Sequence, residues 1–466
     1  MSKKIQSTID ILCEGFKDGG VSYVANFPGF ESHKIFQKLG GQLISANERV
    51  AYDSAFGASL AGKRSLVCMK NVGLNVAADS FLHTMLSGVN GGFVLTVTDD
   101  VKVIGSQERL DSRHYFDFYG GLWFEPSTCE EIYKVGKLSF EASENLDIPI
   151  VIRLTNQTLF QTEKFMLKKS KLPVPIKKPA INNPSKYVVH PVYWRDQLKL
   201  LEKRKRKIDK FVFNYYSKIR RQTWNKNKGI IVFGNCEQEL ERYNLLEFDL
   251  LRISSYPFPN VLVREFSKNK NELIVLEQGD PFAYERVQKI IKENTQNFRI
   301  SSYTGDIADL TGTWRIWKEL STFFKALNSI NPSFVVSDVT QFTVESESMI
   351  DACLCLGAAI GIGIGLASSG VEYPFCIVGD VSFIHGGYIA LMEAISRNIS
   401  MGIVIVDNGG SWCTGGQKTT FNIYNLGDNI SIHKLPYKKC KEEDIKNVLN
   451  QMRKSNRLSV LYLQVN

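Results

Sequence analysis

Residues 375–410 read FCIVGDVSFIHGGYIALMEAISRNISMGIVIVDNGG, and two short apolar runs in this stretch end in polar residues and glycine. The first run, Phe375–Val378, leads to Asp380, and the second, Gly402–Val406, leads to Asn408. The residues between the two runs have the apolar spacing of a crossover helix. A strand, a helix and a second strand in this order are typical of a doubly wound α/β domain.

The polar ends of the two predicted strands suggest a cation site. If the strands are parallel neighbours with a right-handed crossover, both ends emerge at one edge of the sheet, about 5 Å apart. The Asp380 carboxylate, the Asn408 amide oxygen and a loop carbonyl such as that of Gly410 are ligands that suit Mg²⁺ beside a diphosphate. The glycines let the backbone approach phosphate groups. Spacing alone makes this a weak prediction, because polar residues at strand ends are common.

The strand-helix rhythm recurs in two other blocks of the chain, with strands predicted at Val21–Phe27, Leu43–Ala46 and Gly229–Phe233 among others. A Pro- and Lys-rich stretch separates these blocks. We therefore predict an α/β fold with two doubly wound domains and a smaller α/β domain between them. The predicted segments are a first doubly wound domain at 1–165, a basic linker with a helix at 166–228, a small domain at 229–305, a connector at 306–329 and a second doubly wound domain at 330–466.

Composition is that of an ordinary globular protein, with 44% hydrophobic and 23% charged residues among 466. Neither a signal-peptide pattern at the start nor an apolar run of membrane-spanning length is found. The nine cysteines lack disulfide or zinc spacing. These features favour a cytoplasmic protein without a membrane partner.

The net charge of +9 belongs to one segment. Lys168–Lys228 holds 19 Lys and Arg against 3 acidic residues, a net charge of +16, so the rest of the chain carries −7. Apolar residues recur with helical spacing over Asp196–Arg221. A solvated basic helix face is the first interpretation, and binding to an acidic surface or to nucleic acid is the alternative, with nucleic acid the less favoured partner.

The complete strings resemble a known family. GDVSFIHGG and VDNGGSWCTGGQ, at 379–387 and 406–417, are similar to the diphosphate-binding motif of thiamine-diphosphate enzymes, although Val381 stands where that motif usually has Gly. They are most similar to 2-oxo acid:ferredoxin oxidoreductases, in particular the α subunit of indolepyruvate:ferredoxin oxidoreductase. NFPGFESHKI, NERVAYDSAFGASLAGKRSLVCMKNVGLNVAAD and SQERLDSRHY resemble the same family's pyrimidine-binding domain.

This resemblance implies that 1–165 binds the cofactor's pyrimidine and 330–466 its diphosphate, with a transketolase C-terminal-like domain at 229–305. It implies thiamine diphosphate and Mg²⁺ as cofactors, with Asp380, Asn408 and Gly410 as metal ligands. The implied cofactor-binding residues are Gly29, Glu48, Gly379, Asp380, Val381, Ser382, Asn408, Gly410, Thr414 and Gly415.

Three residues receive catalytic roles by resemblance. Glu48 corresponds to the glutamate that holds N1′ of the aminopyrimidine, although a glutamate in a first helical turn also stabilises the helix dipole. Arg113 would bind the substrate carboxylate, with a surface ion pair as the competing interpretation. His114, chosen because it is the neighbour of Arg113, would move a proton; His33, His83 and His385 are alternatives, and a structural role is the more favoured interpretation of each one taken alone.

The sequence also departs from the family. The region Ser329–Phe342 contains no cysteine, where relatives carry a Cys-Pro-Gly-Cys segment for an iron-sulfur cluster, and Cys353 and Cys355 alone cannot complete four-cysteine ligation. The sequence ends at Asn466, where relatives commonly continue into a ferredoxin-like domain. We therefore expect no iron-sulfur cluster.

Relatives in this family oxidise an enamine intermediate by passing its electrons to the iron-sulfur cluster. Without such an electron acceptor, the enamine must be protonated or attack another carbonyl. The leading hypothesis is a non-oxidative 2-oxo acid decarboxylase or carboligase, a lyase or transferase. The alternative is a catalytic oxidoreductase subunit with a separate electron carrier, and a non-catalytic regulatory homologue is a third. We expect at least a homodimer, with a separate small subunit as a possible partner.

Overall fold

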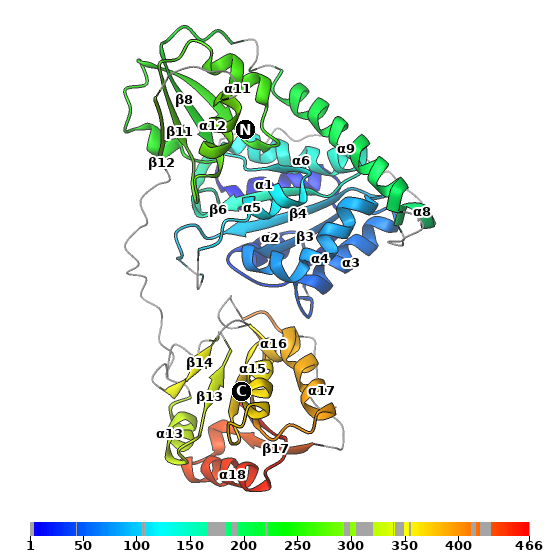
Figure 1. Cartoon of the computed structure of the whole chain (residues 1–466), viewed down its shortest axis with the longest axis vertical. Coiled ribbons are helices and arrows are strands. Elements are labelled where there is room, and N and C mark those ends of the chain that lie inside the picture. Colours follow the sequence, from blue (N-terminus) through cyan, green and yellow to red (C-terminus); the bar gives the residue numbers. More distant parts are fainter. Residues whose placement is uncertain are drawn as a thin grey trace. The chain divides into compact units, whose positions relative to one another are not determined.

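The computed structural model describes residues 4–42, 44–104, 106, 109–165, 183–187, 194–217, 219, 222–292, 299–303, 320–338, 340, 349–353, 356–411, 416–419 and 430–465. Its contacts divide the chain into two compact units, Met1–Thr311 (unit 1) and Gly312–Asn466 (unit 2) (Figure 1). The predicted boundaries of the five segments remain a prediction.

The main sheet of unit 1 has the strand order β10-β5-β6-β4-β3-β2 and is parallel except where β10 pairs with β5. Its strands are β2 (Tyr23–Asn26), β3 (Ser65–Lys70), β4 (Phe93–Asp99), β5 (Leu122–Phe124), β6 (Ile150–Thr155) and β10 (Ser255–Tyr256). Strands β3, β4 and β6 are buried along their whole length, which explains their nearly continuous apolar sequences. Two antiparallel strands, β1 (Lys4–Ser7) and β7 (Thr162–Phe165), form a separate ribbon.

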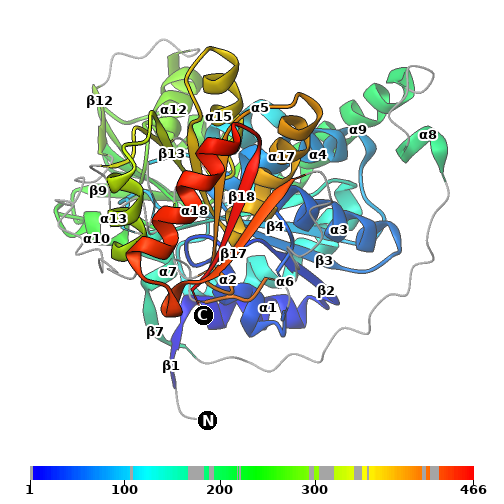
Figure 2. The same cartoon turned by 90° about the horizontal axis from the view of Figure 1, so that it is seen from below.

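Helices cover this sheet, and α1 packs beside α6 (Figure 2). Each of these helices begins at a side-chain cap: the Ser7 hydroxyl accepts from Asp10 N, and the Thr128 hydroxyl accepts from Glu131 N. The helices of this part are α1 (Thr8–Asp18), α2 (Ser32–Lys38), α3 (Glu48–Leu60), α4 (Asn71–Ser87), α5 (Arg113–Tyr119), α6 (Cys129–Leu146) and α7 (Asn156–Phe160).

A second, fully parallel sheet of unit 1 has the order β12-β11-β8-β9. It comprises β8 (Lys228–Phe233), β9 (Phe248–Ile253), β11 (Glu272–Leu276) and β12 (Arg299–Tyr303), with α10 (Glu237–Leu240), α11 (Asn260–Ser267) and α12 (Phe282–Lys292). Phe233 of this sheet packs edge-on against Trp123 of the main sheet. The two sheets therefore share one apolar core.

The basic helix is α9 (Trp194–Tyr215), preceded by α8 (Pro184–Tyr187). Arg204 is buried, and its guanidinium donates to the Leu86 carbonyl at 2.6 Å and pairs with Asp147 at 2.7 Å. A cation at the last carbonyls of α4 stabilises that helix end. The acidic-surface and nucleic-acid interpretations of the other basic residues remain predictions.

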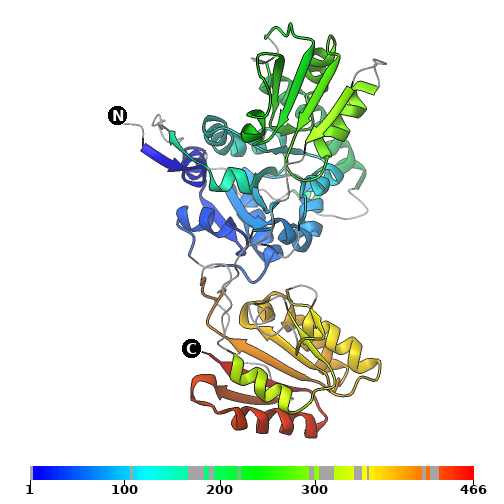
Figure 3. The same ribbon diagram turned by 90° about the vertical axis from the view of Figure 1, so that its left-hand side faces the viewer.

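The sheet of unit 2 is parallel throughout, in the order β14-β13-β15-β16-β18-β17. Its strands are β13 (Val335–Ser337), β14 (Ala352–Cys353), β15 (Phe375–Gly379), β16 (Gly402–Asp407), β17 (Ser431–Pro436) and β18 (Ser459–Gln464). Helices α13 (Ser321–Ser329) and α18 (Glu442–Ser455) pack on one face (Figure 3). Helices α15 (Ala359–Ser368) and α17 (Tyr388–Ser396) pack on the other.

The parallel sheets confirm the predicted α/β fold class. One predicted strand, Leu43–Ala46, is wrong for its described residues, since 44–46 form no strand and Ser45 N makes a single hydrogen bond to Asn26 O. Leu43 lies outside the described residues. In the part of the chain that the structure describes, no helix is both long and apolar enough to cross a membrane.

Candidate functional site

The predicted metal ligands lie together at the carboxyl edge of the unit 2 sheet. Gly379 at the end of β15 is in register with Val406 of β16, so Asp380 and Asn408 follow neighbouring strands. The amide of Asn408 lies 3.2 Å from Asp380 Oδ1 and 2.8 Å from the Gly410 carbonyl. With the amide oxygen turned inward, three oxygens face one another; with the amide reversed, its N–H groups donate to both oxygens. The first arrangement is the one a cation stabilises.

Asp380 is buried, and its Oδ2 is without a hydrogen-bond partner among the described residues. Its other oxygen accepts from Val381 N at 2.8 Å. Burial, with a contribution from the Asp407 carboxylate, raises the pKa of Asp380 to about 7. An orphaned buried carboxylate oxygen is costly without a cation or a proton, so these residues fit the Mg²⁺ that the sequence predicts.

The loop after β16 depends on glycine. Gly410 has φ of 153°, and a Cβ there would lie 2.3 Å from the Gln417 carbonyl oxygen. Ser411 N donates to that carbonyl, which closes the loop at its base. Thr414 and Gly415, predicted to bind the cofactor, lie outside the described residues. The structure thus places the base of the predicted diphosphate loop beside Asn408.

A second carboxylate at this edge was missed from the sequence. Asp338 follows β13 and is fully buried; it accepts from Ala359 N at 2.7 Å, from Gly357 N at 3.1 Å and from the Ser382 hydroxyl. Burial raises the pKa of Asp338. The signal was an aspartate two residues after the apolar run at 334–336, the same spacing that separates Asp380 from its apolar run. Asp338 therefore fixes Ser382, a predicted cofactor residue, to the start of α15.

In unit 1, Glu48 opens α3 and is 6% exposed. Its carboxylate lies on Gly73 of α4, where a Cβ would sit 2.5 Å from Glu48 Oε1. The space beside Gly29 is likewise filled by a side chain, because a Cβ at Gly29 would lie 2.7 Å from the Cβ of buried Lys70. Both predicted residues therefore contact the junction of β3 and α4, at the carboxyl edge of the main sheet. This arrangement does not choose between the cofactor role of Glu48 and its helix-dipole interpretation.

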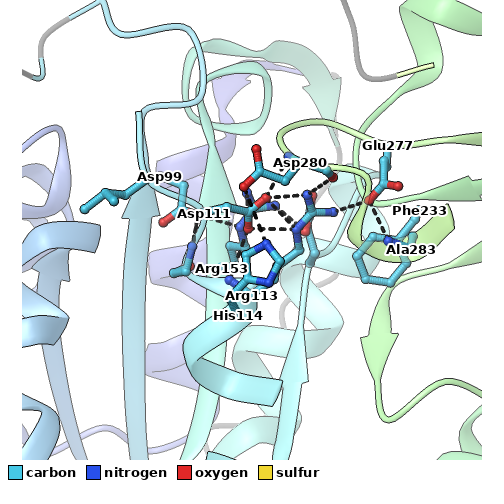
Figure 4. Close-up of polar contacts among 12 residues, drawn as sticks. Asp99, Asp111, Arg113, His114, Arg153, Phe233, Glu277, Asp280 and Ala283 are labelled. Atoms are coloured by element: carbon cyan, nitrogen blue, oxygen red, sulfur yellow. Dashed lines mark hydrogen bonds and ion pairs between the residues drawn. The ribbon is translucent and has the colours of Figure 1, made fainter. Parts of the chain in front are cut away.

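Arg113 is fully buried in an ion cluster between the two sheets of unit 1 (Figure 4). Its Nε donates to Asp111 Oδ1 at 2.8 Å, its Nη1 to Glu277 Oε2 at 2.6 Å and its Nη2 to the Asp280 carbonyl at 2.8 Å. Although burial acts to raise the pKa of Asp111, Arg153 and Arg113 hold it well below its usual range. These contacts favour an ion pair over substrate binding, but the prediction of a surface ion pair is wrong, because Arg113, Asp111 and Glu277 are all buried.

Arg153 of β6 extends the same cluster. Its Nε donates to Asp99 at 2.7 Å and its Nη1 to Glu125 at 2.6 Å, all three side chains being buried. Burial raises the pKa of both Asp99 and Glu125. These pairs join β4 and β6 of the main sheet to Glu125, which follows β5, while the Arg113–Glu277 pair links the cluster to the second sheet.

His114 lies at the outer side of this cluster, with its side chain 54% exposed and its Nε2 3.4 Å from Asp280 Oδ2. Asp111, His114 and Asp280 are close enough to share a cation. Asp111 already accepts from Arg113, however, so a positive charge occupies the place that a metal ion would need. We assign neither a metal nor a proton-transfer role to this group.

Comparison with known proteins agrees with the motifs. Residues 335–460 match the family "Thiamine pyrophosphate enzyme, C-terminal TPP binding domain". The chain is 26% identical to indolepyruvate oxidoreductase subunit IorA of Archaeoglobus fulgidus, over 88% of this chain and 75% of that protein. It is also 26% identical to IorA of Methanothermobacter thermautotrophicus, over 86% and 74%.

Among solved structures, 2-oxoglutarate:ferredoxin oxidoreductase from Magnetococcus marinus covers 65% of this chain and 62% of its own, at 13% identity and a TM-score of 0.48. That likeness is too weak to indicate function. The matched domain and the sequence relatives agree: residues 335–460 are similar to the C-terminal TPP-binding domain of thiamine pyrophosphate enzymes, and the chain resembles the indolepyruvate oxidoreductase subunit IorA over most of its length.

Proposed function

We propose that this protein is a thiamine-diphosphate- and Mg²⁺-dependent enzyme that acts on a 2-oxo acid. The observation that supports this most directly is the convergence of the Asp380 carboxylate, the Asn408 amide and the Gly410 carbonyl at one sheet edge, inside the stretch that matches the thiamine pyrophosphate family. Asp380, Asn408 and the Gly410 carbonyl would hold Mg²⁺, and Ser382 and the loop glycines would face the diphosphate.

When bound, thiamine diphosphate supplies a nucleophilic carbon and stabilises negative charge after loss of CO₂. The proposed task of Glu48 is to hold a ring nitrogen of the cofactor. Its burial and its place at the carboxyl edge of the main sheet support that task. Such a role requires the carboxyl group to share a proton with the ring, which an exposed glutamate would do less effectively.

For the reaction type, we propose the catalytic subunit of a 2-oxo acid oxidoreductase whose electrons leave through a separate carrier. The names of the relatives favour this choice over the non-oxidative reaction. The second candidate is a non-oxidative decarboxylase or carboligase. It is favoured by one feature of the sequence, the lack of cysteine in Ser329–Phe342. Leu354 and Cys355 lie outside the described residues, as does the side chain of Cys353.

We propose a homodimer or larger homo-oligomer. We also propose a possible separate small subunit, which is supported by the naming of the relatives as subunits. We also propose a cytoplasmic location, which rests on composition alone. Light scattering at micromolar concentration with the cofactor added tests the assembly, and a monomeric mass would contradict it.

Cofactor binding and turnover test the function. Calorimetric titration with thiamine diphosphate and Mg²⁺ should give binding that Asp380→Ala and Asn408→Ala weaken, whereas Glu48→Gln should leave binding largely intact and stop exchange of the cofactor C2 proton. Normal exchange in Glu48→Gln would contradict its assignment.

Anaerobic assays with a panel of 2-oxo acids then separate the two reactions. Turnover that requires an added electron acceptor supports the oxidoreductase. An aldehyde or acyloin formed under argon, without any acceptor, supports the non-oxidative candidate. Iron and sulfide analysis of anaerobically purified protein determines whether a cluster is present. No cofactor binding by the unaltered chain would refute both candidates.

A further inference from the structure

Both candidate reactions share one proton transfer. A 2-oxo acid whose carbonyl carbon accepts a nucleophile must gain a proton on the carbonyl oxygen, whether or not electrons leave later. A group near pKa 7 performs this transfer best, and histidine is the usual choice. His114 is the first candidate for the proton donor from the sequence, but in the structure it lies beside Asp280 in the ion cluster of unit 1.

In unit 2, a different histidine, His385, follows the predicted metal ligand Asp380 by five residues. The chain leaves β15 at Gly379, forms the short helix α16 (Asp380–Ser382) and continues into a π-helical turn, η3 (Phe383–Gly387). The N–H of Tyr388 donates to the Phe383 carbonyl five residues earlier. Single π turns are rare and frequently occur at functional sites. His385 is the middle residue of this one.

Contacts fix the position of His385. A Cβ at Gly357 would lie 3.3 Å from His385 Nδ1 and 2.9 Å from the Gly386 Cα, so the turn lies directly on the Gly357 backbone. Gly357 has φ of 86°, and its N–H is bonded to Asp338 and to the Ser382 hydroxyl, both at 3.1 Å. The imidazole therefore lies against the backbone of Gly357, which also fixes Ser382. Ser382 in turn follows Asp380 by two residues.

Burial of this histidine is intermediate, as expected for a group that exchanges protons with a bound molecule. The other described histidine of unit 2, His433, lies on strand β17 and contacts the Ser431 hydroxyl at 3.2 Å. In unit 1, His83 pairs with Asp79 on one helix. Of the two described histidines of unit 2, His385 is thus the one that follows the predicted metal ligand at the end of β15.

We propose that His385 is a catalytic residue that gives a proton to the carbonyl oxygen of the 2-oxo acid. The imidazolium N–H bond breaks as the oxygen becomes a hydroxyl, and the neutral imidazole regains a proton from water, so no oxidant or reductant is needed. This inference rests on the proposed function. It holds for the oxidative and the non-oxidative reaction alike.

The test compares His385→Asn with His433→Asn, a histidine of the same unit outside this site. His385→Asn should lower kcat by about 10²–10⁴-fold and remove the limb of the pH profile that reports the proton donor. Calorimetric affinity for thiamine diphosphate with Mg²⁺ should stay within about twofold in both variants. His433→Asn should keep the unaltered rate. In His385→Ala, added imidazole should restore part of the rate, which a merely structural role would not allow.

A measurement without turnover checks the placement. In protein labelled at histidine, the NMR signal that His385→Asn removes should shift when thiamine diphosphate and Mg²⁺ are added, and the His433 signal should not. An unmoved His385 signal, or a rate of His385→Asn equal to that of the unaltered protein, would overturn the inference while cofactor binding still supports the proposed function. Failure of the unaltered protein to bind the cofactor would overturn both.

Discussion

Replacing Arg113 by Met should destabilise unit 1 by about 3–5 kcal/mol, the usual cost of leaving buried charges without their partner. The estimate follows from the structure. The guanidinium is inaccessible to solvent and makes charged hydrogen bonds to Asp111 and Glu277 at 2.6–2.8 Å. Methionine is similar in length but donates no hydrogen bond, so both carboxylates would stay buried with one cation fewer.

The assay is urea unfolding of the cofactor-free protein, followed by circular dichroism and by tryptophan fluorescence, because Trp123 packs near this cluster. His114→Ala is the matched control: it changes the next residue, whose side chain is 54% exposed, and should alter the free energy of unfolding by no more than about 0.5 kcal/mol. A loss below about 1 kcal/mol for Arg113→Met, together with a raised KM for the 2-oxo acid, would refute the structural role and restore substrate binding.

Three other changes test separate parts of the structure. Asp380→Asn should abolish Mg²⁺-dependent cofactor binding yet stabilise the cofactor-free protein at pH 8. The pKa of Asp380 is about 7 in the folded protein and near 4 in the unfolded chain, so the folded state loses stability as the pH rises between these two values, by at most about 4 kcal/mol. Equal thermal midpoints of the variant and the unaltered protein at pH 8 would contradict this. Arg204→Ala should cost about 2–3 kcal/mol in urea unfolding because the Leu86 carbonyl and Asp147 lose a charged donor, whereas exposed Lys203→Ala should cost little. Gly73→Ala should displace Glu48 and slow C2-proton exchange, whereas Gly57→Ala, which meets no atom within 4 Å, should leave exchange unchanged.

Local patterns were sufficient for much of the architecture. The apolar runs that became β15 and β16 were found within one or two residues because buried parallel strands need continuous apolar sequence. Their neighbouring positions also followed from the sequence, since a short crossover helix joins adjacent strands. The candidate metal ligands could therefore be named before any coordinates. The strand predicted at 44–46 was wrong because this segment makes one hydrogen bond to β2 and does not pair with it along its length. Such pairing depends on the neighbouring strand as well as on the residues of the segment.

Tertiary structure alone decided what the charged side chains contact. Arg113 follows Asp111 by two residues, but Glu277 and the Asp280 carbonyl come from a different sheet, and no local pattern reports that burial. His385 and Gly357 likewise meet only because β15 and α15 lie side by side in the folded unit. Sequence periodicity records which face of an element is apolar, whereas ion pairs, orphaned oxygens and the position of the histidine proposed as proton donor depend on contacts between residues far apart in the chain.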